Sequence, residues 1–218
     1  MLLELDAGES ADESEELWAL ADILAVACGG HAGDAASMAR IVAFCAGRSR
    51  PRIGAHPSYP DRAGFGRRTI AISDDALAAT IEQQCAALAA IAGTVAWVKP
   101  HGALYHDAAA HPAVARAVIR GACAALGRPT LIGPAACALA DAAADAEVSY
   151  LREGFADRGT RPDGSLIPRG EPGALLDDPA AAAARARSLA GSVDTICVHA
   201  DTPGALAIAR AVREALDG

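Results

Sequence analysis

The most constraining feature of this sequence is a regular alternation of short apolar runs with longer segments of helical periodicity. Short runs rich in branched aliphatic residues are typical of buried strands. Repeated strand–helix units require a parallel sheet with right-handed crossover connections. We expect seven strands, at Leu2–Leu5, Ile23–Cys28, Arg52–Ala55, Val95–Val98, Thr130–Ile132, Val148–Leu151 and Thr195–Val198.

Six helices are expected between and after these strands, and most have residues typical of helix boundaries. Short polar side chains cap the first turn of a helix, and glycine readily ends one. The predicted helices lie near Asp34–Ala46, Asp74–Ala92, Pro112–Leu126, Ala135–Ala144, Pro179–Ala190 and Pro203–Leu216. The capping residues are Asp34, Ser73 and Asp178, and the terminating glycines are Gly47, Gly93, Gly127 and Gly191.

The distribution of polar residues indicates how the sheet closes. In an open doubly wound sheet they gather at one switch point, whereas in a barrel all strand carboxyl ends converge on one face. Here polar residues follow several different strands, so we predict a (β/α) barrel of about seven strands that forms a single domain over residues 1–218. The longest irregular segment, Arg152–Leu176, follows the sixth strand and is expected to be a functional loop.

Charge and composition exclude several classes of function. The net charge of −8 argues against nucleic-acid binding, which usually needs a basic face. No apolar stretch approaches the ~20 residues that span a bilayer, and the chain starts without a signal segment. The six cysteines have neither CxxC nor zinc-site spacing, which favours reduced, buried thiols. We therefore expect a cytoplasmic protein with no nucleic-acid or membrane partner.

Polar motifs follow five of the predicted strands and carry four of the six histidines. They begin at Asp6, Gly29, His56, Lys99 and His199. A carboxylate and two imidazoles suit a divalent metal, and Asp6, His31 and His56 could form such a set. Asp34, Asp61 or Asp201 would then orient the rings. The same residues could instead form a metal-free acid/base array. His106 and His111 are expected on the surface.

Lys99 is the only lysine among 19 lysine and arginine residues, and it follows the fourth predicted strand. This suggests a position that needs a compact ammonium group, whose pKa burial can lower. We expect Lys99 to bind a carboxylate or phosphoryl oxygen or to polarise a carbonyl, with His101 beside it. The alternative is an ordinary surface lysine.

Arginines in two glycine-rich segments point to an anionic substrate. Arg67 and Arg68 follow Gly64 and Gly66, and a further group occupies the irregular segment: Arg158, Arg161 and Arg169. A guanidinium forms bidentate hydrogen bonds with carboxylates and phosphates. The sequence has no GxxxxGK[ST], GxSxG or strand-following GxGxxG motif, so we expect no self-sufficient P-loop, hydrolase elbow or dinucleotide site.

Together, these motifs resemble the LamB/YcsF family over nearly the whole chain. The matching stretches are DAGE (6–9), ACGGHAGD (27–34), IGAHPSYPDRAGFGRR (53–68), VKPHGALY (98–105), FADRGTRPDGSLIPRGEPGALL (155–176) and DTICVHADTPGA (194–205). The resemblance implies a distorted (β/α) barrel related to the glycoside hydrolase and deacetylase barrels. It also implies ATP-dependent opening of 5-oxo-L-proline to L-glutamate, together with partner subunits B and C.

The resemblance also suggests roles for the strand-end residues. Catalysis would fall to Asp6, Lys99 and His101, with Asp6 or a histidine acting on water. The small anionic substrate would be bound by Glu9, Arg67, Arg68, Arg158, His199 and Asp201. ATP would be the cofactor, used with the partner subunits, and a divalent metal at Asp6, His31 and His56 is a further expectation.

Several positions depart from the family pattern, in which the opening motif reads DLNCDLGE. Glu4 and Ala25 stand where the family has asparagine, and Gly30 stands where it has phenylalanine; the chain contains no asparagine. Specificity for substrate or partner is therefore open to change. Two alternatives follow: a stand-alone metal-dependent amide hydrolase or deacetylase, and a non-catalytic barrel that scaffolds other subunits.

Overall fold

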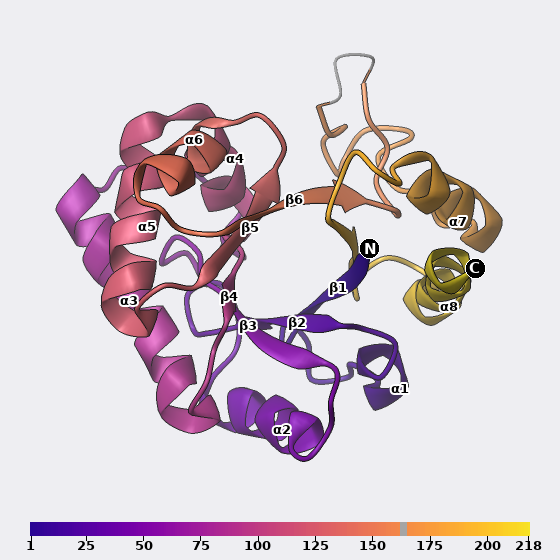
Figure 1. Ribbon diagram of the computed structural model, residues 1–218, viewed down its shortest axis with the longest axis horizontal. Coiled ribbons are helices and arrows are strands. Elements are labelled where there is room, and N and C mark those ends of the chain that lie inside the picture. The colour runs from indigo at the N-terminus through magenta and orange to yellow at the C-terminus, as the bar shows by residue number, and fades with distance from the viewer. Residues whose placement is uncertain (162–164) are drawn as a thin grey trace.

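The computed structural model describes residues 1–161 and 165–218, and its strands form a closed parallel barrel (Figure 1). The order around the barrel is β1-β2-β3-β4-β5-β6-β7, and pairing of Leu2–Leu5 with Thr195–Val198 joins the first strand to the last. The strands are β1 Leu2–Ala7, β2 Ile23–Ala27, β3 Arg52–His56, β4 Trp97–Val98, β5 Thr130–Pro134, β6 Tyr150–Phe155 and β7 Thr195–Val198. The barrel prediction is confirmed, and an open sheet is excluded.

The helices lie around the outside of the barrel (Figure 1). They are α1 Glu15–Trp18, α2 Ala35–Cys45, α3 Asp74–Ala92, α4 Gly102–Ala110, α5 Pro112–Leu126, α6 Ala138–Asp145, α7 Pro179–Ser188 and α8 Ala205–Asp217. The predicted caps are confirmed, since Asp34, Ser73 and Asp178 each accept a hydrogen bond from a backbone N–H of the first turn. Their side chains satisfy N–H groups that have no partner within the helix.

The sequence prediction was wrong about β6 and omitted two helices. The strand was placed at Val148–Leu151, but it continues to Phe155. Its charged residues concealed it: Arg152 pairs with Asp194 outside the barrel, and Glu153 is buried inside. Helix α1 was treated as an acidic stretch, and α4 follows His101 with no side-chain cap to mark its start.

Alternate residues of each strand face the barrel interior, which is layered. Leu3 and Leu5 belong to the large core beneath the helices, whereas Ile23, Trp97 and Ile132 form a separate apolar cluster. This cluster, which we call the base plug, includes the first residues of β2 and β4. Leu2 and Leu151 also pack on this cluster. Residues two positions apart on a strand share a face, so Glu4, Lys99 and Glu153 follow Leu2, Trp97 and Leu151 into the interior. A charged layer therefore lies next to the base plug.

Two predictions about the wider protein can be compared with the structure. All six cysteines are free, and Cys28, Cys85 and Cys197 are buried, as expected for thiols rather than disulfides. Among the described residues, no helix has both the length and the apolar character needed to cross a bilayer.

Candidate functional site

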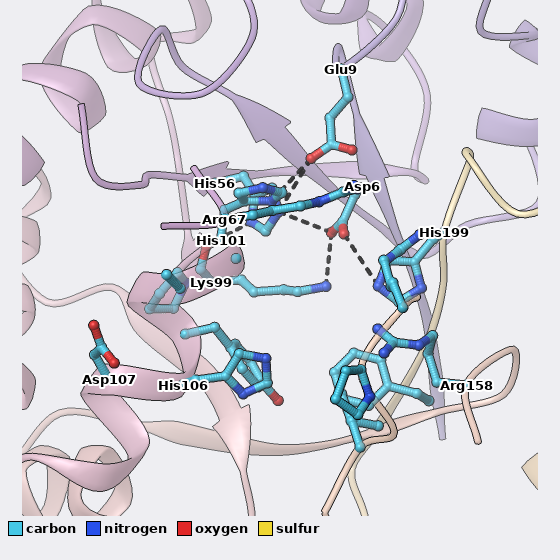
Figure 2. Close-up of a pocket in the computed structure, with 18 of the residues that line it drawn as sticks. Asp6, Glu9, His56, Arg67, Lys99, His101, His106, Asp107, Arg158 and His199 are labelled. Atoms are coloured by element: carbon cyan, nitrogen blue, oxygen red, sulfur yellow. Dashed lines mark hydrogen bonds and ion pairs between the residues drawn. The ribbon is translucent and has the colours of Figure 1, made fainter. Parts of the chain in front are cut away.

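A cavity of about 480 Å³ lies at the carboxyl ends of the strands (Figure 2). Active sites of (β/α) barrels occupy this face because every strand delivers its following loop there. The loops after β1, β3, β4, β6 and β7 all contribute side chains to the cavity. Predicted site residues in its lining are Asp6, Glu9, His56, Arg67, Lys99, His101, Arg158, Arg169 and His199.

Lys99 is 3% exposed and lies at the centre of a cluster of acidic groups inside the barrel. Its Nζ donates to Asp6 Oδ1 at 2.8 Å, to Glu4 Oε2 at 3.1 Å and to Cys197 Sγ at 3.2 Å. Glu153 Oε1 lies 3.0 Å from the same atom. The surface alternative for Lys99 is thus wrong.

The charge states of this cluster follow from burial and from the close contacts. Burial acts to lower the pKa of Lys99, but Asp6, Cys197 and the two glutamates outweigh it and hold that pKa well above its usual value. Burial alone, which can lower the pKa of a lysine, does not decide the pKa of Lys99. Burial also raises the pKa of Glu4 well above its usual range, and the carboxyl of Glu153 adds to the effect. Burial thus favours the protonated form of Glu4.

A backbone carbonyl fixes the ring orientation of His56, and another fixes that of His101. His56 Nδ1 lies 2.8 Å from the carbonyl oxygen of Lys99, and His101 Nε2 lies 3.0 Å from that of Phe65. The other ring nitrogens, His56 Nε2 and His101 Nδ1, face each other at 3.0 Å. Figure 2 shows the two rings beside Asp6 and Glu9. Glu9 Oε1 is 3.1 Å from His101 Nδ1, and Asp6 Oδ1 is 3.4 Å from His56 Nε2.

His31 lies behind this pair and does not line the cavity. Its ring stacks on that of His101 with centroids 3.6 Å apart and planes within 3°. Its Nε2 lies 2.9 Å from Glu9 Oε1, and its Nδ1 is buried without a hydrogen-bond partner. Burial lowers the pKa of His31 to about 4, so the neutral ring donates its Nε2–H to Glu9.

Gly66 explains how these rings come so close to the following loop. Its φ is +65°, which favours glycine, and a Cβ there would lie 2.9 Å from both His101 Cδ2 and His31 Cβ. Its carbonyl accepts a hydrogen bond from Ala103 N in the first turn of α4. Gly66 thus lets the β3–α3 loop pack against both His31 and His101.

His199 is oriented by Asp157, a residue the sequence reasoning missed. His199 Nδ1 lies 2.9 Å from Asp157 Oδ1, and Asp157 also accepts from His199 N and Thr202 Oγ1. Burial acts to lower the pKa of His199, but the Asp157 carboxylate outweighs it and raises that pKa. The Nε2 atom lies 3.9 Å from Asp6 Oδ2.

The predicted orienting roles of three other aspartates are therefore wrong. Asp34 caps α2, Asp61 binds Arg68, and Asp201 pairs with arginines. The histidines are instead held by Asp157, Glu9 and two backbone carbonyls.

Two of the residues predicted to bind substrate lie outside the cavity lining. Arg68 is 65% exposed at its side chain and pairs with Asp61. Asp201 joins Arg67 Nη2, at 2.9 Å, to Arg169 Nη1, at 2.8 Å. It therefore connects the β3–α3 loop to the irregular segment.

Arg67, Arg158 and Arg169 supply the positive charge of the cavity wall. Arg158 is 7% exposed and uses Nε and Nη2 to bind the carbonyls of Ala174 and Ile167. Arg161 pairs with Glu171 on the surface and does not line the cavity.

Comparison with known proteins identifies the family. The sequence model of the LamB/YcsF family matches residues 3–218. The chain belongs to this family. It is 44% identical over 209 residues to the 5-oxoprolinase A subunit of Mycobacterium avium (strain 104), covering 88% of this chain and 82% of that protein. It is 41% identical over 234 residues to the 5-oxoprolinase A subunit of Methylococcus capsulatus, covering 97% and 90%.

A solved structure has the same fold. The crystal structure of a lactam utilization protein from Thermus thermophilus matches with a TM-score of 0.90 and 32% sequence identity, covering 100% of this chain and 96% of that one. The resemblance inferred from the sequence motifs is thus confirmed.

Sequence reasoning missed several residues of this LamB/YcsF site. Glu4 lies two residues before Asp6, so strand alternation alone places both on the inner face of the barrel. Glu153 was missed because the predicted strand ended at Leu151, which left Glu153 in the irregular segment. Cys197 was noted only as a core thiol. His106 is exposed, as predicted, yet its ring also lines the cavity.

Proposed function

We propose that this chain is the A subunit of a 5-oxoprolinase, which opens 5-oxo-L-proline to L-glutamate with ATP and two partner subunits, B and C. The names of its relatives support the reaction and the existence of partner subunits. The observation that carries the proposal is a single cavity in which arginines face a carboxylate–imidazole group. 5-Oxoproline requires both, because it carries an anionic carboxylate and an unreactive lactam.

The arginines are suited to the carboxylate of the substrate. Arg67 and Arg158 line the cavity, and Figure 2 shows Arg158 across the cavity from His56 and His101. A guanidinium recognises a carboxylate through charge-assisted hydrogen bonds. Binding of the carboxylate on this wall would hold the lactam ring towards Asp6 and the two histidines.

Asp6 is the best candidate to act on water at the lactam. Burial acts to raise its pKa, but His56 and Lys99 outweigh burial and hold that pKa well below its usual range. Its carboxylate stays ionised, beside His56 on one side and His199 on the other. An ionised carboxylate in this position can orient a water molecule and accept its proton.

Lys99 is assigned a positioning role in this proposal. Its ammonium donors are already engaged by Asp6, Glu4 and Cys197, so it is better placed to hold Asp6 than to bind a substrate oxygen. Phosphoryl transfer from ATP to the lactam oxygen would activate the lactam carbon towards water. After water adds, the C–N bond breaks with a proton delivered to nitrogen, and hydrolysis of the resulting acyl phosphate releases phosphate and glutamate. The chain has no P-loop motif, so ATP binding is assigned to the complex with the partner subunits.

The test is glutamate production from 5-oxoproline and ATP, measured with purified chain, with and without subunits B and C. We expect turnover only in the complete mixture, and a loss of at least ~100-fold in kcat for Asp6→Asn, as expected for a lost general base. Asp75→Asn is the control, because Asp75 is exposed on the outer face of α3. Full turnover in the Asp6→Asn complex would exclude a catalytic role and favour the scaffold alternative.

A stand-alone metal-dependent amide hydrolase is the second candidate. The convergence of Glu9, His56 and His101 favours it, since two imidazoles and a carboxylate form a common hydrolytic metal site. Amidase activity of the isolated chain, without ATP or partner subunits, would support this candidate over the first.

A further inference from the structure

We infer that the cavity holds a divalent metal ion bound by Glu9 Oε1, His56 Nε2 and His101 Nδ1. The binding itself does not depend on the proposed reaction, although any role of the metal in lactam opening rests on the proposed function. This set differs from the set predicted from sequence, which was Asp6, His31 and His56.

The hydrogen bonds of the two histidines determine where their protons lie. A backbone carbonyl can only accept, so His56 carries its proton on Nδ1 and His101 carries its proton on Nε2. The nitrogens that remain, His56 Nε2 and His101 Nδ1, then present lone pairs to each other at 3.0 Å. Both residues are buried, at 1% and 7% exposure, so water solvates neither lone pair freely. Two ring nitrogens this close are satisfied either by a proton on one of them, which makes that ring cationic beside Asp6 and Glu9, or by a metal ion bound to both.

Glu9 completes a three-ligand set around the same point. Its Oε1 lies 3.1 Å from His101 Nδ1 and 3.7 Å from His56 Nε2. In a tetrahedral zinc site with bonds of about 2.0–2.1 Å, neighbouring ligand atoms are about 3.3 Å apart. The three observed separations lie on both sides of that value. The donor atoms are therefore already spaced for a tetrahedral ion, with one coordination position left.

Neighbouring groups hold the three proposed ligands by hydrogen bonds of the kind found around metal ligands. Metal-binding histidines usually donate their other ring N–H to a carbonyl or carboxylate, which both rings do here. Ligating carboxylates are themselves hydrogen-bonded, and Glu9 accepts from His31 Nε2. His31 is thereby assigned to positioning Glu9 rather than to binding the metal.

The fourth position would face the cavity close to Asp6. Asp6 Oδ1 lies 3.4 Å from His56 Nε2 and is held by Lys99. Two-histidine, one-glutamate sites with an open position bind water or a carbonyl oxygen in hydrolytic enzymes. A metal here would place its open position beside the carboxylate assigned to act on water.

The test is metal binding by the isolated, chelator-treated chain, without 5-oxoproline. We expect one equivalent of Zn²⁺ by calorimetry, and a visible absorption spectrum of tetrahedral type when Co²⁺ is added instead. His56→Gln and Glu9→Gln should each weaken Zn²⁺ binding more than about 100-fold, beyond the 10- to 100-fold loss typical of residues that only orient ligands. His106→Gln is the matched control, because His106 lines the same cavity without contacting the three ligands. It should bind Zn²⁺ like the wild type.

Two outcomes would overturn the metal site. One is the absence of stoichiometric Zn²⁺ binding, with nitrogen NMR showing a proton shared between the two facing ring nitrogens. The other is unchanged Zn²⁺ affinity in the His56→Gln chain, with its fold verified by circular dichroism. Neither depends on turnover, so failure of the metal site is distinguishable from failure of the proposed reaction.

Discussion

Lys99 neutralises acidic residues that the barrel brings together from distant parts of the sequence. Glu4 and Asp6 come from β1, Glu153 comes from β6, and all three carboxyl groups are within 3.1 Å of its ammonium. A buried charge that loses its partner is much more costly than the intact pair is stabilising. The single lysine of the chain is therefore as important to folding as to the site.

Lys99→Met should lower the free energy of unfolding by about 3–5 kcal/mol, because it leaves buried carboxylates without a counter-charge. Urea denaturation followed by circular dichroism measures this loss. Adding Glu4→Gln to Lys99→Met should recover part of it, since one acidic group is removed. A loss below about 1 kcal/mol would mean that the carboxyl groups are neutral or solvated without Lys99.

Gly30 is a second residue whose identity depends on a distant partner. A Cβ at this position would lie 2.3 Å from Gln84 Oε1 and 2.4 Å from Ser58 Oγ. Gln84 is buried and forms hydrogen bonds with both the N–H and the carbonyl of Ser58. The loss of the family's phenylalanine at position 30 thus coincides with a glutamine occupying that space.

Gly30→Ala should cost about 1–3 kcal/mol, the usual effect of overpacking a filled core. Gln84→Ala should also destabilise the protein by leaving Ser58 without partners. In the double variant the two losses should sum to less than their separate values, because the added methyl group then has room. Simple additivity in thermal denaturation would show that the contact does not limit position 30.

At the scale of single residues, the sequence predicted which types meet but not how they pair. Asp6, Glu9, His56, His101 and His199 were all predicted from their places after strands. Partners such as Asp157, for His199, and Glu153, for Lys99, were not predicted, because these contacts join residues 42 or more positions apart in the chain. The ring orientations of His56 and His101 were also unpredictable, since backbone carbonyls set them.

A partly exposed ion pair between Arg152 and Asp194 links β6 to β7. Asp194 accepts hydrogen bonds from the backbone N–H and the guanidinium of Arg152. This interaction lies where the chain begins β7 and ties that strand to β6. The pair is partly exposed, so its contribution to stability is modest.

Stability should depend on the ionisation of Asp194 in acid. The hydrogen bond from Arg152 is the main cause that lowers the pKa of Asp194 from its ordinary 3.8 to about 2. A carboxylate with a lowered pKa in the folded state stabilises the protein above its unfolded pKa, and this contribution is lost as pH falls through the folded value. The loss should therefore fall between about pH 4 and pH 2.

Asp194→Asn removes this contribution. The variant should be less stable than the wild type by up to about 1 kcal/mol near pH 5, after allowance for solvent screening, and equally stable near pH 2. Urea midpoints at the two pH values measure the difference. Asp75→Asn serves as the control, since Asp75 forms an exposed pair with Arg120 that joins no strands. A difference that persists at pH 2 would contradict the assignment.

Helices and strands were predictable where apolar periodicity was uninterrupted. Helices α3 and α5 and strand β7 were placed with their observed bounds. Helices α1 and α4 were missed and β6 was placed too early, because short length or charged residues remove that signal. Strand β4 was predicted two residues too long and α6 three residues too early. Charge inside a strand is a tertiary effect, because only the closed barrel supplies Lys99 as a partner for Glu153.

At the scale of the whole molecule, Asp22 links the first strand, β1, to the last helix, α8. Its carboxylate accepts from Leu3 N in β1 and from Arg213 Nη1 in α8, each at 2.8 Å. Arg50, just before β3, adds a longer contact. Barrel closure was predictable from the spread of polar residues over many strand ends, but this tie between α8 and β1 was not.

Asp22→Ala should lower the free energy of unfolding by about 1.5–3 kcal/mol, the range for hydrogen bonds to a charged group. Because the strands form one ring, loss of this tie should lower the stability of the whole barrel and leave a single transition. Tryptophan fluorescence and circular dichroism should then give coincident unfolding curves. Asp217→Ala, which removes only an exposed partner of Arg213, should cost less than about 1 kcal/mol. Separate transitions by the two probes would refute the prediction.

The position of the base plug bears on how small molecules enter and leave the cavity. Ile23, Trp97 and Ile132 pack together inside the barrel and none of them lines the cavity, whose walls come from the loop side. We therefore expect small molecules to enter and leave the cavity by the loop side. On the proposed function, glutamate would occupy the same cavity as 5-oxoproline and should therefore act as a competitive inhibitor. On the same proposal, a partner subunit that covers the loops would control both entry and exit.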